Sequence, residues 1–320
     1  MGRFVIRRFL FGLLVLWIIS LAVFALFFIV PHNPARSFCG RQCSPQQVAN
    51  INARLGLNLP IYQQYWHFVK KAAVGDFGIS FVNQAPVTQT LLSRLPVTAS
   101  LAAGATVIWL AIGIPIGVLA ATRPRSIRDR LASLFALTFL SMPTFVLGLL
   151  ALYLFFYKLH ILHITSFFPG GGYIPFTQSP FQWFTHLLLP WFTLALVSAA
   201  TYSRLTRGSL IEVLGEDYIR TARSKGLSER RVVYGHGLRA ALTPVVTQLG
   251  IDVGTLLGGA IVTEQVFGLQ GLGKLAIDSV VIQDLPVIEG TVLLAAVFIV
   301  IANILVDIAY AFLDPRVRLT

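Results

Sequence analysis

Long uncharged apolar runs alternate with short basic segments along the whole chain. A membrane-spanning α-helix needs about 20 consecutive, mostly apolar residues to cross the hydrocarbon core of a bilayer. Four runs without Asp, Glu, Lys or Arg meet this length or come close to it: residues 9–30, 97–122, 131–157 and 290–306. Each is predicted to form a membrane-spanning helix.

Two further spans are less evident. No Asp, Glu, Lys or Arg occurs in residues 159–203, but the Pro-Gly-Gly-Gly turn signal at 169–172 divides this stretch into a loop and a span near 186–203. A weaker apolar run, 241–263, is interrupted by Asp252. The pattern predicts six transmembrane helices and an all-α polytopic membrane protein.

The composition excludes an ordinary soluble protein. Of the 320 residues only 12% are charged and 56% are hydrophobic, whereas soluble domains are roughly 25% charged, and the mean hydropathy is +0.75. The formal net charge of +12 would suggest nucleic acid as the partner of a soluble protein. Here the basic residues gather between the apolar runs, which indicates membrane topology and contact with lipid instead.

The distribution of Lys and Arg predicts the orientation. With the N-terminus inside, 17 of the 25 basic residues fall on the cytoplasmic side, and six of the other eight lie in the loop 31–96, which is long enough to escape the positive-inside rule. Both termini are then cytoplasmic. The first apolar run is too long for a signal peptide, and residues 31–34 after it are no small-residue cleavage site, so it is expected to remain as a helix.

These spans predict three parts of the chain. They are an N-terminal transmembrane helix, 1–30, an extracytoplasmic loop, 31–96, and a transmembrane domain, 97–320. The last part contains a cytoplasmic segment, 204–243, which is too short for an enzyme domain. We expect this segment to be an interaction surface.

The sequence offers no active site, and neither a catalytic residue nor a metal or cofactor site is expected on this chain. A near match to the phosphate-binding loop ends at Lys274, but Leu275 replaces the hydroxyl that should hold magnesium. On the outer side, an oxidising compartment favours a disulfide between Cys39 and Cys43. Two free thiols are the alternative, and the absence of nearby His or acid argues against a metal.

A few polar residues lie within or near the predicted spans. Burying such groups in a membrane is costly, so they usually face protein or water. They could line a polar pathway or relay protons, or they could hydrogen-bond neighbouring helices. The candidates are Gln248, Asp252, Glu264, Asn303 and Asp307.

The most informative cytoplasmic pattern lies in residues 216–231. Asp217 near its start and Arg223 and Lys225 near its end suit the dipole of a short helix. Gly226 is placed to end that helix with a positive φ.

A second helix is predicted to begin at Ser228 as its N-cap. In the first helix Tyr218, Ile219 and Ala222 share one apolar face. A short two-faced helix under a membrane bundle can transmit a push from a soluble partner. A basic loop held against anionic lipid headgroups is the alternative.

This segment resembles the cytoplasmic coupling motif of permease subunits from binding-protein-dependent ABC importers. The family motif is Glu-Ala-Ala, three residues, then Gly, with a Pro further on. The matching positions here are Arg220, Thr221, Ala222 and Gly226, with Pro244 downstream. The Glu is absent, but the tract 217–227 is similar to the dipeptide and oligopeptide branch, where Arg-Thr-Ala commonly replaces Glu-Ala-Ala.

Further motifs of that branch follow in the correct order, so the resemblance covers the whole chain. One departure is the Pro-His-Asn-Pro-Ala stretch at 31–35, where the family usually has Gly-Asp after the first Pro. The similar segments are 55–60, Gly75–Ser80, Glu264–Phe267 with Gly271–Gly273, and Asn303–Asp307 through Asp314–Arg316.

The resemblance implies a type I ABC importer permease-like bundle in a bacterial-type inner membrane. A homologous second permease would enclose the translocation path with it, and an extracytoplasmic binding protein would deliver a dipeptide or oligopeptide. Two cytoplasmic ATP-binding subunits, which hold ATP and Mg, would dock on the coupling residues. Those residues would be Asp217, Tyr218, Arg220, Thr221, Ala222, Lys225 and Gly226.

Other readings stay open at this point. The same permease role could serve nickel complexes, haem or another small solute. In an ion-coupled secondary transporter, Asp252, Glu264 and Asp307 would carry protons or sodium, although the inverted repeats that many such transporters show are not evident. A structural or receptor-like membrane protein is the remaining alternative.

Overall fold

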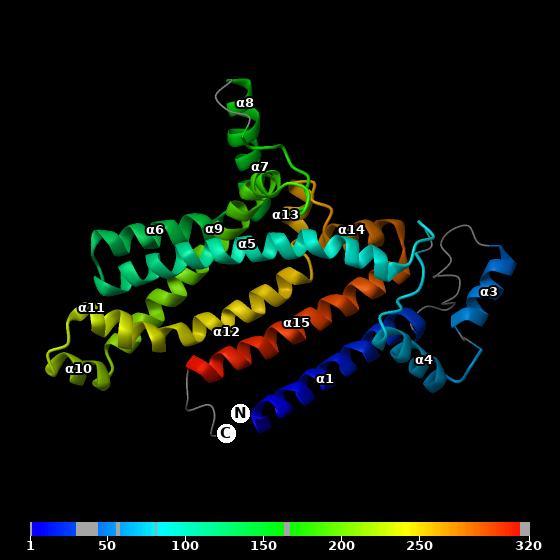
Figure 1. Ribbon diagram of the computed structural model, residues 1–320, viewed down its shortest axis with the longest axis horizontal. Helices are drawn as coiled ribbons and strands as arrows, with labels where there is room; N and C mark the ends of the chain where they lie inside the picture. Colours follow the sequence, from blue (N-terminus) through cyan, green and yellow to red (C-terminus); the bar gives the residue numbers. More distant parts are fainter. Residues whose placement is uncertain (1, 30–43, 56–57, 81, 163–166, 314–320) are drawn as a thin grey trace.

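The computed structural model of the chain describes residues 2–29, 44–55, 58–80, 82–162 and 167–313, and within these ranges the regular structure is helical (Figure 1). An isolated bridge between Ile79 and Pro86 is the sole β-type pairing in the described part. The predicted all-α fold is confirmed.

Six helices of the described residues are long and apolar enough to cross a membrane, as the apolar pattern predicts. Three of these spans contain a short π-helical stretch. The spans are α1 (Gly2–Phe24) with η1 (Ala25–Ile29); α5 (Val87–Thr122); α7 (Thr144–Ala151) with η2 (Leu152–Lys158) and α8 (Leu159–Ile161); α9 (Pro180–Leu214); α11 (Glu229–Arg231) with η3 (Val232–Gly237) and α12 (Leu238–Leu257); and α15 (Leu285–Leu313).

The third apolar run differs from its prediction as one continuous helix over 131–157. The structure divides it into α6 (Ile127–Ser141) and α7, because Met142 turns to an extended conformation (ψ 123°) before Pro143. A proline disfavours the helical conformation of the residue before it and cannot donate a backbone hydrogen bond. α6 therefore stays beside α5 and α9, whereas α7 packs on α9 and α13, and α8 projects away from the bundle (Figure 1).

The centre of the bundle is the long contact between α5 and α9. Small residues bring the two backbones together: a methyl group on Gly117 would lie 2.6 Å from the Thr206 Cβ, and one on Gly113 would lie 2.9 Å from the Ala199 carbonyl oxygen. Helices in a bilayer gain little from hydrophobic burial against each other, so close van der Waals packing of this kind holds them. Around this pair lie α12 and α15, and α1 packs on α15.

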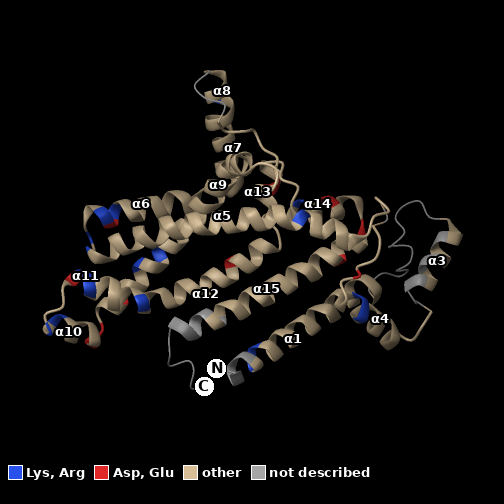
Figure 2. Ribbon diagram, viewed as in Figure 1, with Lys and Arg blue, Asp and Glu red and all other residues tan. Residues whose placement is uncertain are grey.

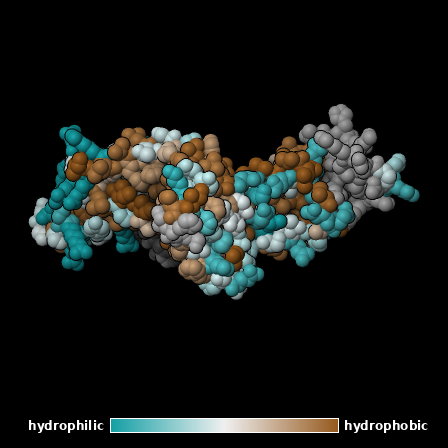
Figure 3. All heavy atoms as spheres, turned by 90° about the horizontal axis from the view of Figure 1, so that it is seen from above, coloured by the Kyte–Doolittle hydropathy of each residue, from teal (hydrophilic) through white to brown (hydrophobic). Residues whose placement is uncertain are grey.

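The two ends of the bundle carry the remaining elements. At one end lie α3 (Pro45–Leu55), α4 (Ile61–Ala73) and α14 (Leu272–Ile282), with α13 (Ile261–Val266) at the nearby turn; at the other lie α10 (Asp217–Ser224) and α11 (Figure 1). Hydrophobic residues cover much of the side between the ends, and hydrophilic residues gather at the α10–α11 end (Figure 3). The molecule therefore has the surface of a membrane-embedded bundle with a hydrophilic α10–α11 end.

Gly117→Leu should weaken the bundle, because the added side chain would push α5 away from Thr206 and Ser203 of α9. We expect a loss of about 1–3 kcal/mol, the usual range for overpacking a core, seen as a lower thermal midpoint of the detergent-solubilised protein. Gly208→Leu is the matched control, because no atom lies within 4 Å of the methyl group added there. Equal midpoints for the two variants would contradict the assignment of α5–α9 as the central contact.

Candidate functional site

The cytoplasmic pattern predicted from the sequence folds into a short helix that is exposed at one end of the bundle. α9 ends at Leu214, the chain turns, and α10 runs from Asp217 to Ser224. Gly226 then adopts a φ of +78°, as predicted for the residue that ends this helix. Ser228 takes the N-cap position of α11 as predicted, but its side chain makes no capping hydrogen bond.

One side chain anchors α10 to the bundle. Ile219 is fully buried, Ala222 is half-buried, and Tyr218 is 48% exposed although its pKa is raised by partial desolvation. The predicted apolar face is therefore narrower than expected. The exposed face is formed by Asp217, Tyr218, Arg220, Thr221, Lys225 and Gly226.

Arg223 ties α10 to the elements on both sides of it. Its guanidinium donates to both carboxylate oxygens of Glu229, over 3.1 and 2.7 Å, and to the backbone carbonyl oxygen of Leu214 over 3.4 Å. The hydrogen bond to Glu229 raises the pKa of Arg223 above its ordinary value. The loop between α9 and α11 is therefore braced, and α10 is held as a small rigid body.

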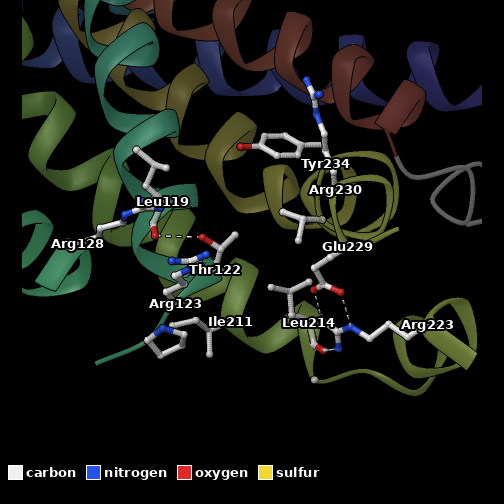
Figure 4. Close-up of a pocket in the computed structure, with 14 residues that line it drawn as sticks. Leu119, Thr122, Arg123, Arg128, Ile211, Leu214, Arg223, Glu229, Arg230 and Tyr234 are labelled. Carbon is white, nitrogen blue, oxygen red and sulfur yellow. Dashed lines mark hydrogen bonds and ion pairs between the residues drawn. The ribbon is translucent and has the colours of Figure 1, made fainter. Parts of the chain in front are cut away.

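Behind this loop lies a cleft of about 600 Å³ between the ends of α5, α9 and η3 (Figure 4). Arginines from three segments reach it, and this end of the bundle is rich in Lys and Arg (Figure 2). Apolar side chains form much of the rest of its wall. The residues that face it include Leu119, Arg123, Arg128, Leu214, Arg223, Glu229, Arg230 and Tyr234.

The α5–α6 turn on the far side of this cleft is tied to α9 by an ion pair. Asp129 at the start of α6 accepts from the Arg207 guanidinium, Nε to Oδ1 at 2.5 Å and Nη2 to Oδ2 at 2.9 Å, and from the backbone amide of Arg125 at 2.8 Å. Asp129 is buried, and the hydrogen bond from Arg207 is the main reason why the pKa of this carboxyl is lowered. Hence both walls of the cleft are fixed to the same helix.

A second polar cluster lies in the middle of the bundle. The carboxylate of Asp252 on α12 accepts from the Tyr202 hydroxyl of α9 and from the Gln248 amide of α12, each over 2.9 Å. The Tyr202 ring packs against Trp109 of α5, with ring centroids 5.8 Å apart. Two of the five polar residues selected from the sequence, Gln248 and Asp252, therefore belong to one network.

Glu264 belongs to a different cluster, where α13 and α14 meet α5. This fully buried carboxylate accepts from the Thr98 hydroxyl at 2.7 Å and from the Lys274 backbone amide at 2.8 Å. Thr98 in turn accepts from the Leu272 amide at 2.8 Å. All these contacts are with protein, and they hold the α13–α14 turn against α5.

Of the other predicted residues, the structure describes the side chain of Asn303 alone, and it belongs to neither cluster. Asn303 is exposed on α15. The side chain of Asp307 and the pair Cys39 and Cys43 lie outside the described residues.

Sequence reasoning missed several polar partners that are distant along the chain. Among them is a buried bond between Ser80 and Asp284, 2.5 Å long, which ties the segment before α5 to the start of α15. The other missed partners are Thr98, Asp129, Tyr202 and Arg207.

The model of the family of binding-protein-dependent transport system inner membrane components matches residues 113–319, and the N-terminal companion model of the same membrane components matches residues 1–102. The chain belongs to this family, the permease components of ABC importers, as the resemblance predicted. These are membrane components rather than enzymes, and the ATPase activity resides on separate subunits.

The individual relatives are permeases as well. The chain is 39% identical, over 99% of its length and 99% of theirs, to the glutathione transport system permease protein GsiC of Escherichia coli K12 and of Shigella dysenteriae. The fold is similar to a chain of the inward-facing MetNI methionine ABC transporter, with a TM-score of 0.55 and 21% identity, covering 71% of this chain and 97% of that one.

Asp129→Asn should lower the thermal midpoint at neutral pH, because it removes the charge that pairs with Arg207. The expected cost is about 1.5–3 kcal/mol, the range for hydrogen bonds to charged groups. Because the pKa of Asp129 is lowered in the folded state, this stabilisation is present above the ordinary Asp pKa and is lost as pH falls through the lowered value. Asp217→Asn is the control, since its 3.5 Å pair with Arg220 is largely exposed. A midpoint difference between wild type and Asp129→Asn that grows on acidification would contradict this account.

Proposed function

We propose that this permease forms half of the translocation path of an ATP-driven importer for peptides or peptide-like solutes. A homologous permease would form the other half, two ATP-binding subunits with ATP and Mg would bind from the cytoplasm, and a binding protein would deliver substrate from outside. The exposed, braced helix α10 carries this proposal, because a small rigid helix outside the bilayer suits a soluble partner. Support for the substrate class comes from the glutathione permease relatives, since glutathione is itself a tripeptide.

In this proposal α10 passes the closure of the ATP-binding subunits to the spanning helices. Its exposed face, with Asp217, Tyr218, Arg220, Thr221, Lys225 and Gly226, would contact those subunits, while Ala222 and Ile219 pack toward the bundle. A push on α10 would reach α9 through the Arg223 bond to Leu214, and the α11–α12 span through the Arg223 bonds to Glu229. The Asp129–Arg207 pair would extend it to α5 and α6.

The orientation and the division of the chain follow from the same assignment. The α10 end, rich in Lys and Arg, would be cytoplasmic, with both termini on that side. The helix of residues 1–30, the outer loop 31–96 and the domain 97–320 with its coupling segment 204–243 would be the three parts. α3 and α4 in the outer loop would then lie on the side from which the binding protein approaches.

Gly226→Trp tests the coupling role. The φ of +78° and the open space around Gly226 mean that a large side chain would strain the end of α10 and protrude from its exposed face. We expect the variant to insert in the membrane. When the tagged permease is purified in mild detergent, the amount of ATP-binding subunit recovered with it should fall at least about tenfold.

Gly172→Trp is the matched control, because Gly172 also has a positive φ (+84°) and no atom within 4 Å of an added methyl group, but it lies in the loop before α9 at the other side of the spans. It should retain the ATP-binding subunits. Normal recovery and normal substrate-stimulated hydrolysis with Gly226→Trp would contradict the docking assignment.

Uptake by the reconstituted four-subunit transporter with its binding protein tests the substrate class. Glutathione and trialanine are expected to accumulate in vesicles when ATP is supplied to the cytoplasmic face of the transporter. Ni²⁺ complexes and haem are the comparison solutes. Uptake should stop without ATP and persist with an uncoupler. Accumulation of only the Ni²⁺ complex or haem would reassign the substrate, and collapse with the uncoupler alone would favour an ion-coupled transporter.

A further inference from the structure

α12 carries a polar stripe that the described residues of the chain leave partly open. Thr247, Ile251 and Thr255 are exposed, with Gln248 and Asp252 half-buried beside them. The hydroxyls of Thr247 and Thr255 donate to backbone carbonyl oxygens of α12 itself, so Asp252 is the group on this face that calls for a polar surrounding. The opposite side of the helix buries Gly250 and Gly254 against α15. Polar side chains at membrane depth face protein or water rather than lipid. The side of α12 with Asp252 and Gln248 therefore faces a second subunit or an aqueous path.

Within the stripe, the Asp252 carboxylate is fixed in place. The Tyr202 hydroxyl and the Gln248 amide each donate to one of its oxygens. Tyr202 is fully buried, and its ring is packed on Trp109. Groups held by buried neighbours on rigid helices are positioned in advance for a ligand. Each carboxylate oxygen accepts a single hydrogen bond here, although it can accept about two.

The described part of the chain supplies no counter-ion for this carboxylate. Asp252 forms no ion pair with any described residue. The sequence explains why: the helices around it have long stretches without Lys or Arg, at 95–122 in α5, 180–203 in α9, 240–273 around α12 and 285–313 in α15. An isolated carboxylate in a membrane is costly, so a cation from outside this chain should offset its charge.

We propose that Asp252 is a substrate-contacting site of the translocation path, which pairs transiently with an ammonium or guanidinium group of the passing solute. This inference rests on the proposed importer function and deepens it. The cation could be the α-ammonium group of a peptide or a basic side chain, since both present the same donors to a carboxylate. Tyr202 and Gln248 are positioning residues that aim the carboxylate at the path.

Asp252→Asn tests the site, because it removes the charge with little change of shape. The intact transporter is reconstituted, and uptake is measured with the binding protein saturated by each of three probes: trialanine, N-acetyl-trialanine and N-acetyl-Ala-Lys-Ala. The ratio of wild-type to variant uptake should be roughly tenfold for a cationic probe, as expected for loss of a hydrogen bond to a charged group. It should stay near one for N-acetyl-trialanine. An effect on trialanine alone assigns the site to the α-ammonium group, and one on the lysine probe alone assigns it to a side chain.

Two further variants keep the test sharp. Asp278→Asn removes an exposed carboxylate of α14 that pairs with Lys274. Any change in uptake that it causes should be the same for all three probes. Tyr202→Phe keeps the charge of Asp252 but removes one of its two bonds, so it should give a smaller effect with the same dependence on the probe.

Equal losses for all three probes with Asp252→Asn would overturn the inference and assign the carboxylate to packing or to a cation of the second permease. Wild-type transport of none of the probes would overturn the peptide function and this inference with it. If the wild-type transporter carries the probes but the ratio of wild-type to Asp252→Asn uptake is the same for all three, the inference is overturned and the peptide function stands.

Discussion

The structure depends on how closely α5 and α9 approach each other. In a bilayer the surrounding lipid is as apolar as the side chains, so two helices stay together only where their surfaces fit. Gly113 and Gly117 let the backbone of α5 reach the Ala199–Thr206 stretch of α9, and neither glycine has room for a methyl group. α6, α7 and α12 are arranged around this pair, and the polar bonds at both ends are made between elements that it positions.

The same contact connects the elements at the α10 end of the bundle. α9 continues beyond the bundle to Leu214, and both the Arg207 bond to Asp129 and the Arg223 bond to Leu214 attach to it. A displacement of α10 therefore acts on a helix that is already locked to α5. An exposed ion pair contributes little to stability by itself. The Arg223–Glu229 pair instead braces the loop between α9 and α11 in one geometry.

Features set by neighbouring residues could be predicted from the sequence, and features set by distant ones could not. The apolar runs, with the turn signal at 169–172, were enough for six spans, and Gly226 was enough for the end of α10, because each depends on local chemistry. Pro143 was visible in the third run, but a proline within a helix can bend it or end it, as Pro115 inside α5 shows. Thr98 and Glu264 are 166 positions apart, and no local pattern joins them.

Two carboxylates that look alike in sequence illustrate this limit. Asp252 and Glu264 both interrupt or border the same weak span, and both could be read as pathway groups or as packing groups. Glu264 is enclosed, with hydrogen bonds from a hydroxyl and a backbone amide, so its acceptor capacity serves the α13–α14 turn. Asp252 is half-buried, has one bond to each oxygen, and borders exposed threonines. Both carboxylates accept one side-chain or backbone hydrogen bond on each oxygen, so the difference between them is burial: protein encloses Glu264 completely, whereas Asp252 keeps an open side from which a solute can be met.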